Sequence, residues 1–368
     1  MNLRRLCDNR TPMVTRCVPM ADRHGNDVLV VVAKMTYCVG ADGAVLVPSL
    51  SSPIRMADVG TSDAPGASIR YPSDLVDEKL GTDVLLVGTA YPPADRPVTE
   101  MSVSVRVETG RATIQSTVKV VGTRVYYRSV LGVAPGPPAV LGPTPLVYEL
   151  AFGGREDDAP SGPLVDRRNP VGVGVASDPL KLVGLRAPAL EDPRAPLSSR
   201  APAPAGFGPI AAWWSPRAER FGTHDAAWQR EHAPLRPTDY NPRASSCAPA
   251  DLWSEAPLAG DEQVEVLGAT PEGVWRFQLP RYAPRFRSYV RGVERQHETH
   301  LDTYLIDADA RRVELTWRAA IPIPRTLELI DAVVVQGDRP FPESMVEQIR
   351  SSERAGGGGG AAGGRGST

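Results

Sequence analysis

The chain has 368 residues and a formal net charge of −2, with acidic and basic residues interspersed. It lacks the basic excess that nucleic acids attract, so no nucleic-acid partner is predicted. The most apolar run, residues 28–33, is too short to cross a bilayer, and the first 20 residues lack the apolar segment of a signal peptide. We therefore expect no membrane insertion.

Composition favours a mostly β protein. The chain contains 37 Pro and 34 Gly, and short apolar runs lie between them, which is typical of strands joined by turns and loops. The four cysteines, Cys7, Cys17, Cys38 and Cys247, show no CxxC spacing, so neither a zinc ribbon nor a redox motif is predicted. Reduced thiols are expected, which fits a cytoplasmic location.

The first part of the chain predicts two hairpins. Residues 2–20 are read as extended, and residues 28–39 as a β-branched strand that turns at 41–43 and returns from 44 to 47. Lys34 falls inside this strand and is expected to face solvent at an edge. After a polar stretch at 68–83 with a possible helical turn, residues 84–93 read as a buried strand. Residues 101–107 alternate cleanly and pair with a return strand at 112–127.

The middle of the chain is irregular. Residues 145–154 are predicted as a strand, after which about a hundred residues show little regular pattern. One short helix is expected at 226–232, capped by Thr223 or Asp225.

Strands resume toward the C-terminus. They are predicted at 263–267, 274–279 and 285–292, in a hairpin of 300–306 with 312–321, and at 326–336. A short terminal helix at 341–354 and a disordered Gly-rich tail at 355–368 follow. The predicted fold is an antiparallel β-sandwich or two packed β-sheet units. One domain, 1–340, is expected, with two possible subdomains at 1–150 and 255–340 joined by a Pro/Gly-rich loop lobe at 151–254.

Residues 202–251 hold the candidate partner-binding side chains. This stretch sustains neither helical nor strand periodicity, yet it is too aromatic for a solvated linker. Paired Trp with nearby Arg suits a protein partner if exposed, because these residues dominate interface hot spots, and the alternative is packing beneath loops. The candidates are Phe207, Ile210, Trp213, Trp214, Arg217, Phe221 and Trp228.

No segment of the sequence carries a complete metal-binding, catalytic or nucleotide-binding motif. His297, His300 and Asp302 are the nearest approach to a metal signature, but residues three apart on a strand face opposite sides. His224 and Asp225 would need Cys247 or a serine to act as a catalytic set, and no nucleophile elbow is present. The Gly-rich segments 152–154 and 169–174 are followed by Pro-rich sequence rather than a helix, so turns are favoured over nucleotide binding. No cofactor and no catalytic residue is predicted.

A set of short segments, in this order and spacing, resembles the bacterial domain of unknown function 2169 family over about residues 1–336. The segments are 83–88 (DVLLVG), 145–154 (PLVYELAFGG), 169–174 (NPVGVG), 204–210 (PAGFGPI), 222–228 (GTHDAAW), 237–243 (PTDYNPR), 248–252 (APADL) and 315–318 (LTWR). The chain departs from the family pattern at 122–126 (GTRVY), at 187–191 (APALE) and at His224.

The resemblance implies a cytoplasmic accessory protein of type VI secretion. Such a protein acts as an adaptor or chaperone that binds an effector or a spike-tip protein and helps to load it, without chemistry. Docking near Trp213 and Phe221, or strand addition at a hairpin edge, are the expected modes of contact. Two alternatives stay open: a metal-dependent hydrolase that uses a His/Asp cluster, and a carbohydrate-binding β module with Trp platforms.

Overall fold

The computed structural model describes residues 6–48, 51–130, 132–323, 326–342 and 345. The predicted terminal helix lies almost wholly outside these residues, and the predicted tail lies outside them entirely. The fold is mostly β, with packed sheets, as the sequence indicates. Within the described residues, no helix is long and apolar enough to span a membrane.

The largest sheet is built around β3 (Asp27–Val39), whose β-branched sequence favours an extended strand. Every residue from Val28 to Tyr37 is buried, so both faces of this strand are covered. The sheet has seven strands in the order β19-β7-β24-β25-β3-β2, with β4 paired to β3. Its other strands are β2 (Val14–Ala21), β4 (Val45–Leu46), β7 (Thr82–Val87), β19 (Trp253–Ser254), β24 (His300–Asp307) and β25 (Arg312–Pro322).

A second sheet of five strands grows from the alternating hairpin. Val103, Val105 and Val107 of β9 are buried, while Arg106 and Glu108 on its other face are exposed. The strand order is β18-β10-β9-β20-β21. The strands are β9 (Glu100–Thr109), β10 (Ala112–Val121), β18 (Leu190–Glu191), β20 (Gln263–Leu267) and β21 (Val274–Gln278).

A third sheet of four strands has the order β1-β26-β22-β23, in which β1 and β26 are parallel. Its strands are β1 (Cys7–Asn9), β22 (Pro284–Val290), β23 (Val293–His297) and β26 (Ile330–Gly337). The N-terminal β1 thus joins a sheet that is otherwise made from the C-terminal part of the chain.

Short elements complete the fold. The two-stranded ladders are β5 (Val59–Gly60) with β6 (Ile69–Tyr71), β8 (Thr89–Ala90) with β13 (Thr144–Pro145), β11 (Tyr126–Ser129) with β12 (Gly132–Pro135), β14 (Phe152–Gly153) with β17 (Val173–Gly174), and β15 (Arg155–Glu156) with β16 (Leu164–Val165). The helices are α2 (Ala226–Glu231) and the 3-10 turns η1 (Tyr148–Leu150), η2 (Pro179–Leu182), η3 (Ala218–Phe221), η4 (Pro242–Ser245), η5 (Ala250–Leu252) and η6 (Leu327–Leu329).

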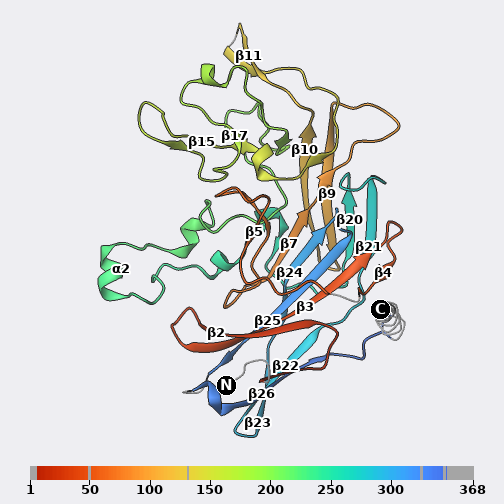
Figure 1. The fold of residues 1–368 in the computed structure, drawn as a ribbon, viewed down its shortest axis with the longest axis vertical. Helices are drawn as coiled ribbons and strands as arrows, with labels where there is room; N and C mark the ends of the chain where they lie inside the picture. Colours follow the sequence, from red (N-terminus) through yellow and green to blue (C-terminus); the bar gives the residue numbers. More distant parts are fainter. Residues whose placement is uncertain (1–5, 49–50, 131, 324–325, 343–344, 346–368) are drawn as a thin grey trace, which may run out of the picture.

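One hydrophobic core connects the three larger sheets. It contains Val31 and Leu315 of the seven-stranded sheet, Val105 of the five-stranded sheet and Val333 of the four-stranded sheet. In Figure 1 the molecule is elongated, with the β11–β12 hairpin at the top, the sheets below it and β23 at the bottom. Strands from the first 150 residues and strands after residue 255 share each of these sheets.

Several local predictions are wrong. Lys34 is not at a solvated edge but fully buried, because β3 is an interior strand and segment 51–80 covers the face from which Lys34 projects. The stretch 145–154 is not one strand: it holds η1, and Gly153 and Gly154 take positive φ values of 145° and 108° where the chain packs against Asn169.

Three other boundaries differ. Residues 68–83 form β6, bends and the start of β7 rather than a helical turn. The return strand ends at Val121, because Gly122 lies against the backbone of Ala139. The last strand begins only at Ile330, after η6. The predicted helix at 226–232 is confirmed as α2, and Asp225 is its cap, accepting a hydrogen bond from the Trp228 amide.

Candidate functional site

One face of the seven-stranded sheet lies in the main core, and the other face carries charged side chains beside a small hydrophobic cluster formed by Val28, Val30, Val32 and Ile54. Because side chains alternate along a strand, Ala33 and Leu315 enter the core, while Lys34 and Glu314 face the other way. Segment 51–80 lies across this second face and covers it. We call the eight charged side chains found there the buried ionic layer; they are Lys34, Arg55, Lys79, Arg318, Asp74, Asp83, Asp302 and Glu314.

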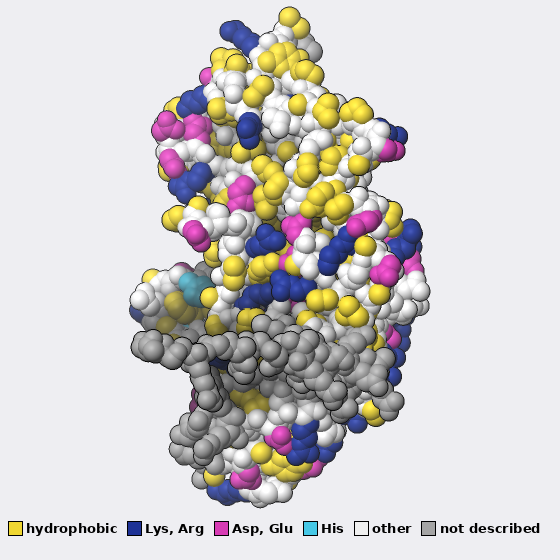
Figure 2. All heavy atoms as spheres, turned by 45° about the vertical axis from the view of Figure 1, so that its right-hand side comes forward, with side chains coloured by type: hydrophobic (Ala, Val, Ile, Leu, Met, Phe, Trp, Pro, Cys, Tyr) yellow, Lys and Arg dark blue, Asp and Glu magenta, His cyan; other side chains and the backbone are white. Residues whose placement is uncertain are grey.

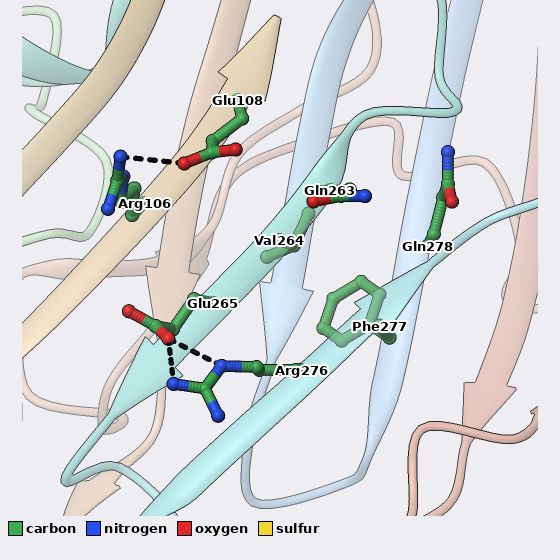
Figure 3. Close-up of a pocket in the computed structure, with 8 residues that line it drawn as sticks. All are labelled: Arg106, Glu108, Gln263, Val264, Glu265, Arg276, Phe277 and Gln278. Atoms are coloured by element: carbon green, nitrogen blue, oxygen red, sulfur yellow. Dashed lines mark hydrogen bonds and ion pairs between the residues drawn. The ribbon is translucent and has the colours of Figure 1, made fainter.

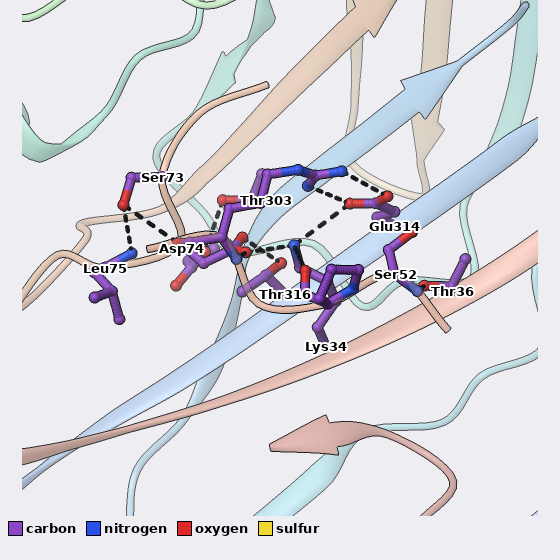
Figure 4. Close-up of polar contacts among 12 residues, drawn as sticks. Lys34, Thr36, Ser52, Ser73, Asp74, Leu75, Thr303, Glu314 and Thr316 are labelled. Atoms are coloured by element: carbon purple, nitrogen blue, oxygen red, sulfur yellow. Dashed lines mark hydrogen bonds and ion pairs between the residues drawn. The ribbon is translucent and has the colours of Figure 1, made fainter. Parts of the chain in front are cut away.

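Lys34 occupies the middle of this layer (Figure 4). Its ammonium group forms an ion pair with Asp74, lies 3.4 Å from Glu314 Oε2 and donates to the carbonyl of Pro53. Arg55 holds Glu314 with two parallel hydrogen bonds of 2.6 and 2.9 Å. The backbone amide of Arg55 donates to Asp74 at 2.7 Å and ties two parts of segment 51–80 together. The Lys34–Asp74 and Arg55–Glu314 pairs fasten this segment to the sheet.

Two further pairs extend the layer along the sheet. Lys79 Nζ lies 2.7 Å from Asp83 Oδ2 and 2.8 Å from Thr303 Oγ1. Asp83 also accepts a hydrogen bond from the Cys247 amide at 2.9 Å, which brings the 151–254 region onto the same face. Arg318 pairs with Asp302, next to a β-bulge in β24.

The side chains of the layer are paired with one another, and this pairing shifts the pKa of two of its carboxyl groups. Burial alone would raise the pKa of Glu314, but the hydrogen bonds of Arg55 and the charge of Lys34 outweigh it and lower the pKa to about 2. Burial would likewise raise the pKa of Asp302, and Arg318 and Lys79 reverse the direction. Burial and then the Asp83 charge raise the pKa of the Cys247 thiol to about 12. Such groups hold their charge state through neutral pH, which suits a structural role better than proton transfer.

The metal candidates do not converge. His297 Nε2 hydrogen-bonds to Ser288 Oγ at 2.8 Å across the β22–β23 hairpin, whereas Asp302 is committed to Arg318. His300 begins β24. No group of three or more potential metal ligands occurs in the part of the chain that the structure describes.

The other candidate chemical set is also dispersed. His224 is exposed and meets Trp228 edge to face with ring centroids 4.5 Å apart, and Asp225 caps α2. Cys247 is buried beside Asp83. The three residues therefore form no catalytic constellation.

Three of the seven predicted partner-binding residues are buried packing residues. Phe207 and Trp214 are fully buried, and the ring of Trp214 meets Tyr148 edge to face at 5.3 Å. Arg217 is buried and donates to the carbonyls of Ala244 and Ile210. The loop lobe covers these three side chains, so the structure does not present them on the surface for direct contact with a partner.

The remaining candidates differ in exposure. Trp213 is 58% exposed, so the Trp pair is split between surface and interior. Ile210, Phe221 and Trp228 are half-buried. Trp228 is tied down further by a hydrogen bond from its indole nitrogen to the carbonyl of Leu235 at 2.9 Å.

A hollow of about 400 Å³ lies on the outer face of the five-stranded sheet (Figure 3). Its charged lining residues are paired: Arg106 with Glu108 at 2.6 Å, and Arg276 with Glu265 at 2.5 Å. The charges in this hollow cancel, so it presents no net charge to an ionic ligand.

Sequence reasoning missed a surface at the far end of the molecule. Apolar side chains are exposed along β11, at its turn, and on the η2 segment that hydrogen-bonds to β11 through Tyr126. We call this the distal apolar surface; its residues and exposed fractions are Val125 (48%), Tyr127 (49%), Val130 (103%), Leu180 (50%), Val183 (43%) and Leu185 (55%). Figure 2 shows hydrophobic side chains gathered at the top of the molecule. The signal in the sequence was a pair of apolar runs, VYYRSVLGV and LKLVGL, set in the irregular region.

Comparison with known proteins gives one family. A family model described as an uncharacterized protein conserved in bacteria (DUF2169) matches residues 24–318, about four-fifths of the chain. Searches of curated proteins and of solved structures gave no match.

Proposed function

Because the chain belongs to the bacterial domain of unknown function 2169 family, we propose that it is a non-enzymatic adaptor that binds a protein partner in the cytoplasm. The observation that carries this proposal is the distal apolar surface. Six large hydrophobic side chains are exposed around one hairpin, and apolar groups gathered in this way on a soluble domain mark an interaction site.

The chemistry of this surface favours a particular kind of partner. Tyr127 supplies a large amphipathic ring, and Arg128 and Arg186 are exposed beside it. Tyr and Arg are the residues that most often dominate binding energy at interfaces. An apolar segment flanked by acidic residues would complement them. A type VI secretion effector or spike-tip protein is the partner that the family resemblance favours.

The buried ionic layer also supports a binding role rather than a catalytic one. Its ions are paired with one another and covered by segment 51–80, so the layer secures the scaffold rather than presenting reactive groups. A rigid scaffold that displays a hairpin at one end is what a binding module requires.

The test is affinity capture of the tagged full chain from its native organism at moderate salt. Mass spectrometry should find an effector or spike polypeptide in near-stoichiometric amount. The double change Tyr127→Asp and Val130→Asp should remove that polypeptide while leaving the melting temperature of the chain unchanged.

The control is Val293→Asp, at an exposed position on the hairpin at the opposite end, where Val293 is 58% exposed. This variant should keep the partner. Capture that survives the double change would refute the distal apolar surface as the binding site. Enrichment of unrelated enzymes only would refute the secretion role.

A further inference from the structure

Two cysteine side chains meet where the first two strands cross from one sheet to another. Cys7 lies on β1 and Cys17 on β2, and the two strands are joined by a turn. Thr15 and Cys17 are two residues apart on β2, so their side chains point to the same face of that strand. The Cys7 thiol donates to Thr15 Oγ1 at 3.6 Å, which holds it beside Cys17.

The pair can be reached from solvent. A hollow of about 440 Å³ is lined by both cysteines together with Thr15, Arg16, Pro53 and Ile54. Cys7 is half-buried, and Cys17, although only 8% exposed, forms part of the wall. A small molecule that enters this hollow meets Cys7 first.

We propose that Cys7 and Cys17 are a redox site that forms a reversible disulfide by exchange with a low-molecular-weight disulfide. The Cys7 thiolate attacks one sulfur of the small disulfide and releases one small thiolate, which leaves a mixed disulfide on Cys7. The Cys17 sulfur then attacks the Cys7 sulfur, gives up its proton and expels the second small thiol. Two protein thiols are oxidised and one small disulfide is reduced to two thiols, so atoms and electrons balance.

The roles of the two thiols follow from their surroundings. The neighbouring Cys17 thiol is the main cause that lowers the pKa of Cys7 to about 7, and the pKa of Cys17 is raised. The lowered pKa increases the share of Cys7 that is thiolate near neutral pH. The thiolate is the form that attacks a disulfide, so Cys7 should react faster than an unperturbed thiol.

The bond would have a structural consequence. β1 pairs with β26 in the four-stranded sheet, and β2 pairs with β3 in the seven-stranded sheet. A disulfide between Cys7 and Cys17 would therefore join the two sheets covalently, at a site separate from the distal apolar surface. The oxidised chain should melt at a higher temperature than the reduced chain.

The test uses the full chain incubated with oxidised glutathione at pH 7, followed by alkylation of free thiols and digestion with trypsin. Cleavage after Arg10 and Arg16 separates the two cysteines, so the bond appears as peptide LCDNR linked to peptide CVPMADR. This linked pair should be the main disulfide, form faster in the folded chain than in concentrated urea, and disappear on reduction.

Two variants locate the chemistry. Cys17→Ala should trap glutathione on Cys7 as a stable mixed disulfide. Cys38→Ala, which removes a thiol outside the pair, should leave the linked peptides unchanged. The proposal is overturned if the wild-type chain keeps both thiols free, if glutathione stays on Cys7 without exchange, or if the linked peptides form only after unfolding.

Discussion

Lys34 illustrates what a single residue can do inside a strand. It lies in a run of ten consecutive buried residues, and removing an ammonium group from water carries a large free-energy penalty. The Asp74 and Glu314 carboxylates offset that penalty, and through them Lys34 connects β3 to segment 51–80 and to β25. The residue is therefore a structural tie between parts of the chain that are distant in sequence.

Replacing this ammonium group should be costly. Lys34→Met keeps the apolar stem but leaves Asp74 without its ion partner, so the free energy of unfolding should fall by about 3–5 kcal/mol. The matched control is Lys119→Met on β10, which breaks an exposed pair with Glu100 of β9 and should cost less than about 1 kcal/mol. Urea unfolding curves of the two variants make the comparison, and equal losses would mean that the buried ionic layer adds no stability.

At the scale of elements, regular strands were predictable and the irregular lobe was not. Residues 28–39 and 101–107 carry β-branched runs or strict alternation, and both were confirmed as strands. The stretch 145–154 misled because its apolar residues resemble a strand, yet Tyr148 instead packs on Trp214 from a 3-10 turn. That contact joins residues 66 positions apart, and no local pattern encodes it.

The residues of the candidate site were likewise only partly predictable from the sequence. Arg318 and Glu314 lie inside the predicted strand 312–321, and nothing in its pattern indicates their partners, which come from segment 51–80 and from β24. Segment 51–80 buries these side chains only in the folded chain, so the sequence around them does not reveal their burial. The exposure of Tyr127 and Val130 was also invisible in the sequence, since it depends on which way the β11–β12 hairpin projects.

Two adjacent tryptophans in the loop lobe differ in burial, so the stabilities of their alanine variants can be compared directly. Trp214→Ala would empty a fully buried position and should lower the free energy of unfolding by about 3–5 kcal/mol. Trp213→Ala removes a side chain that is 58% exposed and should change it by about 0.5 kcal/mol or less. Thermal and urea unfolding provide the measurement, with Trp214→Phe as a partial rescue. Similar losses for the two alanine variants would contradict the packing of the lobe described here.

For the whole molecule, the buried ionic layer gives stability a definite pH dependence. The pKa of Glu314 falls from 4.5 to about 2 on folding, so the folded state favours the ionised form. The ionised Glu314 carboxylate therefore adds about 3 kcal/mol to the free energy of unfolding. This stabilisation is complete above pH 4.5 and is lost as the pH falls toward 2. Asp302, whose pKa is also lowered, acts in the same direction. The layer joins the sheet to its cover, so the loss should appear in global unfolding rather than in one loop.

Urea unfolding midpoints measured from pH 6 down to pH 2 test this expectation. The wild-type midpoint should decline steeply below pH 4.5, and Glu314→Gln, although less stable at pH 6, should decline less steeply because its side chain does not titrate. Glu108→Gln, which alters an exposed pair on the five-stranded sheet, should follow the wild-type slope. If Glu314→Gln and the wild type lose stability in parallel, acid sensitivity arises elsewhere in the molecule and the layer is not its source.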